Sequence, residues 1–141
     1  MASDPNSNHR FIVEIGGKAV AAFTECTLPT LEFDTVEQKE GGLNTYVHIL
    51  PGQRKSGRLV LKRGLTSSQE LFAWYMDLLG GNLAKAKKTV AVIMYDLRGN
   101  EMSRWDFTDA LPVKWSGPQL KADQAAVAIE TLELMVHEYV P

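Results

Sequence analysis

The sequence predicts a mainly β protein of the α+β class, an antiparallel β-barrel or sandwich of about seven or eight strands with one flanking helix. Three observations support this fold class. Short runs of alternating apolar and polar residues, rich in branched and aromatic side chains, recur along the chain. Clusters of glycine, proline and asparagine separate these runs. One segment near residue 70 has the period of a helix instead. The length of 141 residues predicts a single domain, residues 1–141.

The N-terminal part of the chain is expected to begin with a β-hairpin. The polar residues 1–9 are interpreted as a flexible N-terminal arm. Arg10–Ile15 (RFIVEI) alternates and is rich in branched and aromatic residues, which is typical of a strand. Gly16-Gly17 is a hairpin-turn signal. Lys18–Leu28 should therefore return antiparallel, until Pro29 interrupts it.

Three more strands are expected before residue 65. They are Leu31–Val36, Thr45–Leu50 and Gly57–Lys62. A polar, glycine-containing bend at Gln38–Asn44 should separate the first two, and Pro51-Gly52 should open a loop before the third. Gly64 is expected to end the third strand.

A helix is predicted at Ser68–Leu79. Apolar residues recur there at helical spacing, at Leu71, Trp74, Tyr75, Leu78 and Leu79. Glu70 follows Ser67 at the spacing of a capping box, which predicts how the helix begins. Gly80-Gly81 is a typical C-terminal stop.

The C-terminal half returns to strand patterns. A strand is expected at Lys88–Leu97, a turn at residues 98–100, its hairpin partner at Glu101–Phe107, and a further extended piece at Ala110–Trp115 that residues 116–118 break. The last segment, Ala125–Val140, fits both a helix and a strand, and periodicity alone does not decide between them.

The segment PGQRKSGRL, Pro51–Leu59, comes close to the glycine spacing of a nucleotide-binding phosphate loop. That loop needs a lysine for the terminal phosphates, a serine or threonine for magnesium, and a following helix. Here Arg58 replaces the lysine, Leu59 replaces the hydroxyl, and a strand pattern follows. Nucleotide hydrolysis is therefore not predicted.

Other catalytic and metal-binding arrangements are also not predicted, so the chain is not expected to be an enzyme or to hold a cofactor. His9, His48 and His137 are widely separated and have no second ligand at a chelating spacing. Cys26, the single cysteine, is interpreted as a small core residue. Carboxylates such as Glu130 and Glu133 are explained as a polar face or as partners of basic residues.

Charge is distributed in two adjacent segments of opposite sign. An acidic segment carries Glu32, Asp34, Glu37 and Glu40, and a basic one carries Arg54, Lys55, Arg58, Lys62 and Arg63. The net charge of −2 does not indicate a protein that coats a polyanion. Three interpretations remain for the basic segment: a solvated face, a nucleic-acid footprint, or one half of a head-to-tail subunit contact.

Several motifs in this order resemble a known family. They are Gly41-Gly42, Leu50-Pro51-Gly52 with Lys55, Leu61–Gly64 (LKRG), a Ser/Thr-started helix with Trp74, Tyr95–Leu97 (YDL), Pro112 with Lys114-Trp115, and Ile129–Leu134 (IETLEL). The chain resembles, from end to end, the inner-tube (tail tube) protein of contractile phage tails and extracellular contractile injection systems. It is also similar to the tube protein of type VI secretion.

The resemblance implies a small β-barrel or sandwich whose copies form hexameric rings. The rings would stack into a rigid hollow tube that sheath contraction drives through a target envelope, conducting DNA or a protein cargo. It also implies that Ala125–Tyr139 is a long strand. The implied partners are other copies of the chain, a sheath protein, baseplate or spike and tube-terminator proteins, and lumenal cargo. The particle would be assembled in the bacterial cytoplasm, as a virion tail or an injection particle.

The expected subunit contacts combine the two charged segments with the bend between them. The residues expected at these contacts are Glu32, Asp34, Glu37, Glu40, Gly41, Gly42, Asn44, Tyr46, Arg54, Lys55, Arg58, Lys62 and Arg63. Residues 38–46 are expected to reach a neighbouring ring. Two alternatives of other classes are a flavin-type split barrel that binds a small ligand and an oligonucleotide-binding barrel that uses the basic segment.

Overall fold

The computed structural model describes residues 10–20, 23–39, 47–64, 68–120, 122, 128–136 and 138–140. These residues form ten strands and two helices. In chain order they are β1 (Arg10–Ile15), β2 (Lys18–Val20), β3 (Phe23–Thr27), β4 (Phe33–Lys39), β5 (Val47–Arg54), β6 (Gly57–Gly64), α1 (Glu70–Leu79), α2 (Leu83–Ala86), β7 (Lys88–Tyr95), β8 (Glu101–Ser116), β9 (Ile129–Val136) and β10 (Glu138–Val140).

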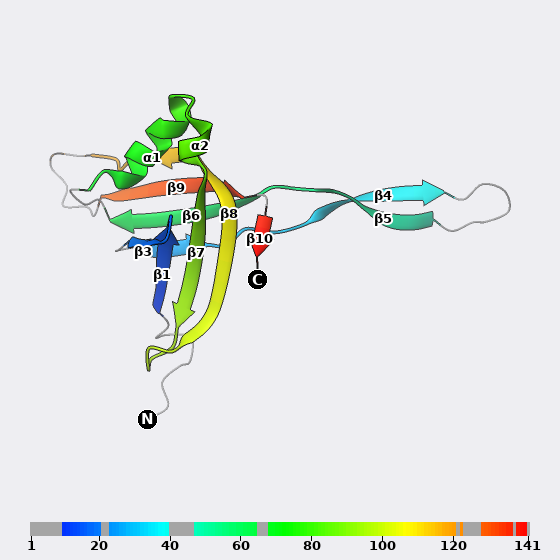
Figure 1. Ribbon diagram of the computed structural model, residues 1–141, viewed down its shortest axis with the longest axis horizontal. Helices are drawn as coiled ribbons and strands as arrows, with labels where there is room; N and C mark the ends of the chain where they lie inside the picture. Colours follow the sequence, from blue (N-terminus) through cyan, green and yellow to red (C-terminus); the bar gives the residue numbers. More distant parts are fainter. Residues whose placement is uncertain are drawn as a thin grey trace.

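An eight-stranded antiparallel sheet forms the body of the protein. Its strand order is β2-β1-β7-β8-β9-β6-β3, with β10 also paired to β8. The 16-residue β8 links two layers, because its first part pairs with β7 and its last part, from Leu111 to Ser116, pairs with β9. Figure 1 shows β1, β7 and β8 running across β6 and β9. The body is therefore a sandwich of crossed layers that share one long bent strand.

The two edges of this sheet, β2 and β3, lie close together. Only residues 21 and 22 separate Val20 from Phe23 in the chain. Three peptide links span at most about 11 Å, so the sheet must curl until its edges are that near. The predicted mainly β barrel or sandwich with a flanking helix is confirmed, in the form of a sandwich that is not a closed barrel, since β2 and β3 are not paired with each other among the described residues.

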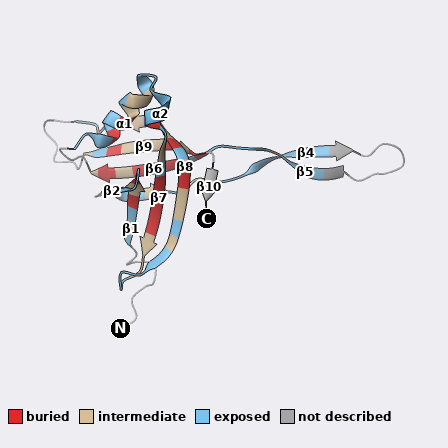
Figure 2. Cartoon of the chain, viewed as in Figure 1, coloured by how far each residue is buried: buried red, intermediate tan, exposed pale blue. Residues whose placement is uncertain are grey.

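The core fills the space between the two layers. Each strand contributes alternate residues: Leu59 and Leu61 come from β6, and Leu132, Leu134 and Val136 come from β9. Val13, Val90, Val92 and Phe107 contribute from the other layer. Figure 2 shows these buried positions along β6, β7, β8 and β9.

Helix α1 covers one end of this core. It buries Leu71 and Trp74, which were predicted from their helical spacing. The indole Nε1 of Trp74 donates to the carbonyl of Ala86 at 2.6 Å, which fastens the short helix α2 to α1. Helix α2 was not predicted; its single turn begins at Asn82, whose side chain accepts from the backbone N–H of Lys85.

The beginning of α1 differs from the prediction. The helix starts at Glu70 rather than Ser68, its N-cap residue is Gln69, and no side chain caps it. The capping-box prediction is wrong for Glu70. Its carboxylate accepts a hydrogen bond from Arg63 instead of capping the start of the helix. Ser67 lies outside the described residues. The glycine stop is confirmed: Gly81 has φ of +82°, a conformation that glycine adopts without strain.

The expected return strand Lys18–Leu28 is divided. Gly16 and Gly17, both with positive φ, form the predicted turn, and β2 pairs with β1. β3 instead pairs with β6 in the other layer. The division depends on the strands with which the two halves pair, and local alternation does not specify that pairing.

The segment around Pro51 also differs from its prediction. β5 runs from Val47 to Arg54 through Pro51-Gly52, which were expected to open a loop. A strand at the edge of a two-stranded sheet tolerates proline because one side of it needs no ladder hydrogen bond. β4 extends to Lys39, so the first residues of the expected bend are strand. Residues 40–46, the remainder of that bend and its continuation, lie outside the described residues.

The C-terminal half agrees with the predictions in most places. β7 and β8 form the expected hairpin, and Gly99 has the positive φ of its turn. The two pieces expected at Glu101–Phe107 and Ala110–Trp115 are one continuous strand. Ile129–Val136 is a strand, so the helical alternative for this part is wrong, and residues 123–127 lie outside the described residues.

Candidate assembly surface

Strands β4 and β5 form a two-stranded hairpin that stands apart from the body. They pair with each other and with no other described strand. Figure 1 shows this hairpin extending away from the sheets on the side opposite α1. It carries Asp34, Glu37 and Arg54 of the expected contact residues, and Glu32 and Lys55 flank it, so its geometry decides what these residues can do.

Two glycines allow close backbone approach at this hairpin and its root. A Cβ on Gly52 would lie 2.9 Å from the carbonyl oxygen of Asp34 in β4. A Cβ on Gly57 would lie 2.7 Å from the Cβ of Pro29, in the segment that leads into β4. The glycines of the PGQRKSGRL segment therefore lie within strands, where neighbouring backbone leaves no room for a side chain.

The acidic and basic segments meet at the root of the hairpin. The backbone N–H of Lys55 donates to the carbonyl of Glu32 at 2.9 Å, and its Nζ lies 3.2 Å from Asp34 and 3.8 Å from Glu32. The hydrogen bond to Asp34, with the charges of both carboxylates, raises the pKa of Lys55. Lys55, Glu32 and Asp34 are about half exposed, so this cluster remains at the surface.

The two charged segments are therefore not two independent surfaces of opposite sign. Lys55 is paired with Glu32 and Asp34 within the chain, and Lys62 lies 3.5 Å from Glu25. The residues that remain exposed without an ion pair to another described residue are Glu37, Arg54 and Arg58. Glu40, Gly41, Gly42, Asn44 and Tyr46 lie outside the described residues.

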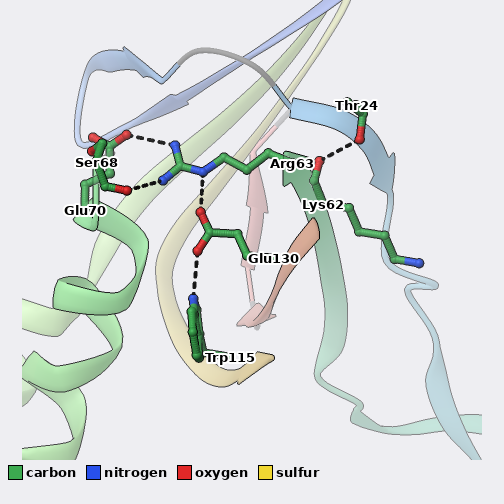
Figure 3. Close-up of polar contacts among 7 residues, drawn as sticks. All are labelled: Thr24, Lys62, Arg63, Ser68, Glu70, Trp115 and Glu130. Atoms are coloured by element: carbon green, nitrogen blue, oxygen red, sulfur yellow. Dashed lines mark hydrogen bonds and ion pairs between the residues drawn. The ribbon is translucent and has the colours of Figure 1, made fainter. Parts of the chain in front are cut away.

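Arg63 lies in the interior, which corrects its expected place among exposed contact residues. Its Nε donates to Oε1 of Glu130 at 2.5 Å and its Nη1 lies 3.0 Å from Oε1 of Glu70 (Figure 3). The other oxygen of Glu130 accepts from Nε1 of Trp115 at 3.0 Å. The network joins β6, β9, β8 and α1. Burial opposes the charge of Arg63, but the hydrogen bonds that Arg63 donates to Glu130 and Glu70 outweigh it and raise the pKa of Arg63.

The alternation along β6 contained the signal for this buried position. Leu59 and Leu61 are core residues, and Arg63, two positions after Leu61, lies on the same face of the strand. Glu130 precedes Leu132 and Leu134 in the same way on β9. The strand period of the charged residues places Arg63 and Glu130 each on the core face of its own strand, whereas their pairing follows from the register of β6 and β9.

A second ion-pair cluster covers the outer face of β7. Arg104 on β8 lies opposite Ile93, and Glu14 on β1 lies opposite Ala91. Nη2 of Arg104 reaches Glu14 at 3.4 Å, so the guanidinium crosses over β7. Its hydrogen bond to Asp106 contributes most to raising the pKa of Arg104. This bridge explains why Ala91 and Ile93 are buried although they face away from the core.

The described residues offer neither a metal site nor a membrane-spanning helix. Within them, no group of three or more His, Cys, Asp or Glu residues is placed to hold a metal ion. None of the helices in the described part of the chain is long and apolar enough to cross a membrane.

Solved structures with a similar fold include chains of the anti-feeding prophage and of an extracellular contractile injection system, and an Hcp1 protein. A chain from the 6-fold symmetrised baseplate of the anti-feeding prophage is 25% identical, with a TM-score of 0.78 over 99% of this chain and 96% of that chain. A chain from the PVC sheath–tube complex in its extended state is 23% identical, with a TM-score of 0.75 over 93% of this chain and 86% of that chain. Hcp1 from Flavobacterium johnsoniae is 16% identical, with a TM-score of 0.52 over 92% of this chain and 97% of that chain.

The family follows from the sequence itself. No curated protein sequence matches the chain significantly. The family model of the T4-like virus tail tube protein gp19, however, matches residues 7–140, which include all ten strands and both helices. The chain therefore belongs to the T4-like virus tail tube protein gp19 family.

Proposed function

We propose that this protein is the structural subunit of the inner tube of a contractile, phage-tail-like injection particle. Six copies form a ring, and rings stack into a hollow tube that conducts DNA or a protein cargo when a sheath contracts around it. Sheath, baseplate and tube-terminator proteins are its partners. The tube is assembled in the bacterial cytoplasm and forms part of a virion tail or an extracellular injection particle.

The observation that carries this proposal is the match to the tail tube family over residues 7–140. The likeness to a chain of the anti-feeding prophage baseplate, at 25% identity over nearly the whole chain, supports it further. The edges at β2 and β3, which have no further partner among the described strands, and the hairpin that stands apart from the body are features that assembly with other copies would cover. No covalent chemistry is proposed, because sheath contraction supplies the work.

The contact surface that we propose is smaller than the charge pattern suggested. It comprises the exposed Glu37, Arg54 and Arg58 and the surface cluster of Lys55 with Glu32 and Asp34. Lys62 and the residues Glu40, Gly41, Gly42, Asn44 and Tyr46 belong to the same proposed contact with a neighbouring subunit or ring. Arg63 is left out of the proposed contact because its side chain lies in the core.

Electron microscopy of the purified protein and of native particles tests the function. We expect rings and stacked tubes; a protein that stays monomeric at high concentration and occurs in no tailed particle would contradict the proposal. Arg58→Glu and Lys62→Glu should weaken stacking and make it more sensitive to salt. Lys87→Glu, an exposed lysine beside α2, is the matched charge reversal and should leave stacking unchanged.

A further inference from the structure

A cavity of about 320 Å³ lies where the start of α1 meets the end of β8. Seven described residues line it: Ser68, Gln69, Phe72, Trp115, Pro118, Leu120 and Glu130. Most of its surface is apolar, and the carboxylate of Glu130 is the one charged group among these lining residues. A volume of this size is at the lower end of the range for ligand pockets, so the cavity suits a single side chain rather than a large cofactor.

The aromatic walls of the cavity are held in place by contacts within the protein. The rings of Phe72 and Trp115 meet edge to face, with their centroids 4.8 Å apart and an angle of 63° between their planes. The indole of Trp115 donates to Glu130, and a Cβ on Gly117 would lie 2.8 Å from its Cη2, so the backbone of Gly117 packs closely on the ring. The two rings therefore form a preformed corner in the wall of the cavity.

The polar end of the cavity is acidic. Arg63 pairs with both Glu130 and Glu70, so two carboxylates share one guanidinium and one negative charge remains in this network (Figure 3). Arg63 does not line the cavity, so a ligand meets the carboxylate of Glu130 rather than the guanidinium. Each oxygen of Glu130 accepts one hydrogen bond from a described residue, which leaves further acceptor sites on this carboxylate.

We infer that this cavity binds an arginine side chain that a partner protein presents. Arginine combines an apolar stem with a planar guanidinium, which stacks on aromatic rings and donates to carboxylates. An anionic ligand would be repelled, and a purely apolar ligand would cover Glu130 without supplying a donor. Phe72 and Leu120 are 37% and 79% exposed, and a polypeptide would cover this apolar rim, whereas a free small molecule would leave it in water. The inference goes beyond the proposed function and does not depend on it.

Two peptides that differ in one charge test the inference on the wild-type protein. An acetylated and amidated Ala-Arg-Ala peptide carries the guanidinium, and the same peptide with citrulline in place of arginine has a neutral group of the same shape. Incorporation of fluorotryptophan gives the three tryptophans separate fluorine NMR signals, which Trp→Phe variants assign. We expect the signal of Trp115 to shift saturably with the arginine peptide, at an affinity at least about tenfold higher than with the citrulline peptide.

A matched pair of variants tests the role of the negative charge. Glu70→Gln makes the network with Arg63 neutral and should weaken binding of the arginine peptide about threefold to fivefold. Glu101→Gln is the control and should leave the affinity unchanged. Glu101 is as exposed as Glu70, at 49%, and also pairs with an arginine, Arg104, but it does not line the cavity. Phe72→Leu keeps an apolar wall but removes one ring, so it should weaken binding about threefold and provides a second test if Glu70→Gln does not fold.

Several results would overturn the inference. Equal affinities for the two peptides would show that the cavity accepts an uncharged side chain and does not select the guanidinium. A shift of the Trp74 or Trp105 signal without a shift of the Trp115 signal would place the peptide elsewhere on the protein. The absence of any saturable shift, or unchanged binding in a folded Glu70→Gln variant, would contradict it as well. None of these results requires that the protein form tubes, so a failure here is distinct from a failure of the proposed function.

Discussion

Arg63 and Glu130 face each other across strands β6 and β9 and form an ion pair inside the protein. They are direct cross-strand partners, and their side chains are 2% and 3% exposed. Trp115 donates to the same carboxylate from β8, and Arg63 continues to Glu70 and the carbonyl of Ser68 at the start of α1. One guanidinium therefore ties the sheet to the helix that covers it.

Removal of the carboxylate partner should destabilise the protein strongly. Glu130→Ala leaves the Arg63 guanidinium buried without its main partner, and we expect a loss of about 3–5 kcal/mol in the free energy of unfolding. Urea denaturation of the monomeric protein measures this loss. The surface pair of Lys114 on β8 and the partly exposed Glu133 on β9, at 3.3 Å, provides the control: Glu133→Ala should cost less than about 1 kcal/mol.

Replacement of both buried charges distinguishes charge burial from packing. If the unpaired charge causes the loss, Arg63→Met combined with Glu130→Leu should recover most of the stability, because apolar residues of similar size replace a buried ion pair at little cost. A double variant as unstable as Glu130→Ala would show instead that the hydrogen bonds to Trp115 and Glu70 are needed.

Loss of the Trp74 indole N–H should loosen α2. Trp74→Phe keeps an aromatic ring in the core but removes the donor to the carbonyl of Ala86, a residue that is fully buried. We expect the free energy of unfolding to fall by about 1–3 kcal/mol. Relative to the wild type, amide hydrogen exchange should also become faster in Leu83–Ala86, and more so there than in β7. Equal exchange rates in the variant and the wild type would argue against this role of the indole.

Gly57 and Gly64 are glycines of the same strand with opposite surroundings. Gly57→Ala would put a methyl group 2.7 Å from the Cβ of Pro29 and 3.2 Å from the carbonyl oxygen of Thr30, whereas a Cβ on Gly64 meets nothing within 4 Å. We expect Gly57→Ala to destabilise the protein by about 1–3 kcal/mol and to impair assembly, because the root of the hairpin must shift. Gly64→Ala should be nearly neutral; equal effects of the two changes in thermal unfolding would refute the explanation.

The thiol of Cys26 should react slowly in the folded protein. Cys26 is partly buried and packs against the core, and burial raises the pKa of Cys26 to about 11. The rate of alkylation by iodoacetamide at pH 8.5 should thus be about 100-fold lower in the folded than in the denatured protein. A folded-state rate that is half-maximal near pH 9 would contradict this.

The same shift predicts how stability changes in alkali. In the unfolded chain the pKa of Cys26 has its ordinary value of 9.0, and in the folded protein it is about 11. Between these two pH values the unfolded thiol loses its proton while the folded thiol keeps it. The folded state then binds more protons, so stability should fall as the pH rises through this range. Cys26→Ser should show a smaller fall in the same denaturation series.

The local pattern of the chain sufficed for most elements of the fold. Arg10–Ile15 with its glycine turn, the hairpin of β7 and β8, and the apolar face of α1 follow from alternation, turn residues and helical period, which depend on neighbours within a few residues. The predictions for Pro51, as a loop residue, and for Glu70, as a helix cap, were wrong because the roles of both residues depend on distant partners. Pro51 is tolerated in a strand only because β5 lies at an edge, and Glu70 turns to Arg63 rather than to its own helix end.

The candidate contact surface was predictable as a region but not residue by residue. The sequence alone indicated opposite charges around Glu32–Arg58, a family of tube proteins and no catalytic constellation. The tertiary structure decided which charges are available: Lys55 is paired at the root of the hairpin and Arg63 is buried, while Arg54 and Arg58 stay exposed. The tertiary structure also decided that β2 and β3, which follow each other in the chain, form the two opposite edges of the sheet. The reason is physical: alternation defines the face of each residue within a strand, whereas the pairing of strands and the pairing of charges depend on long-range contacts that no local pattern contains.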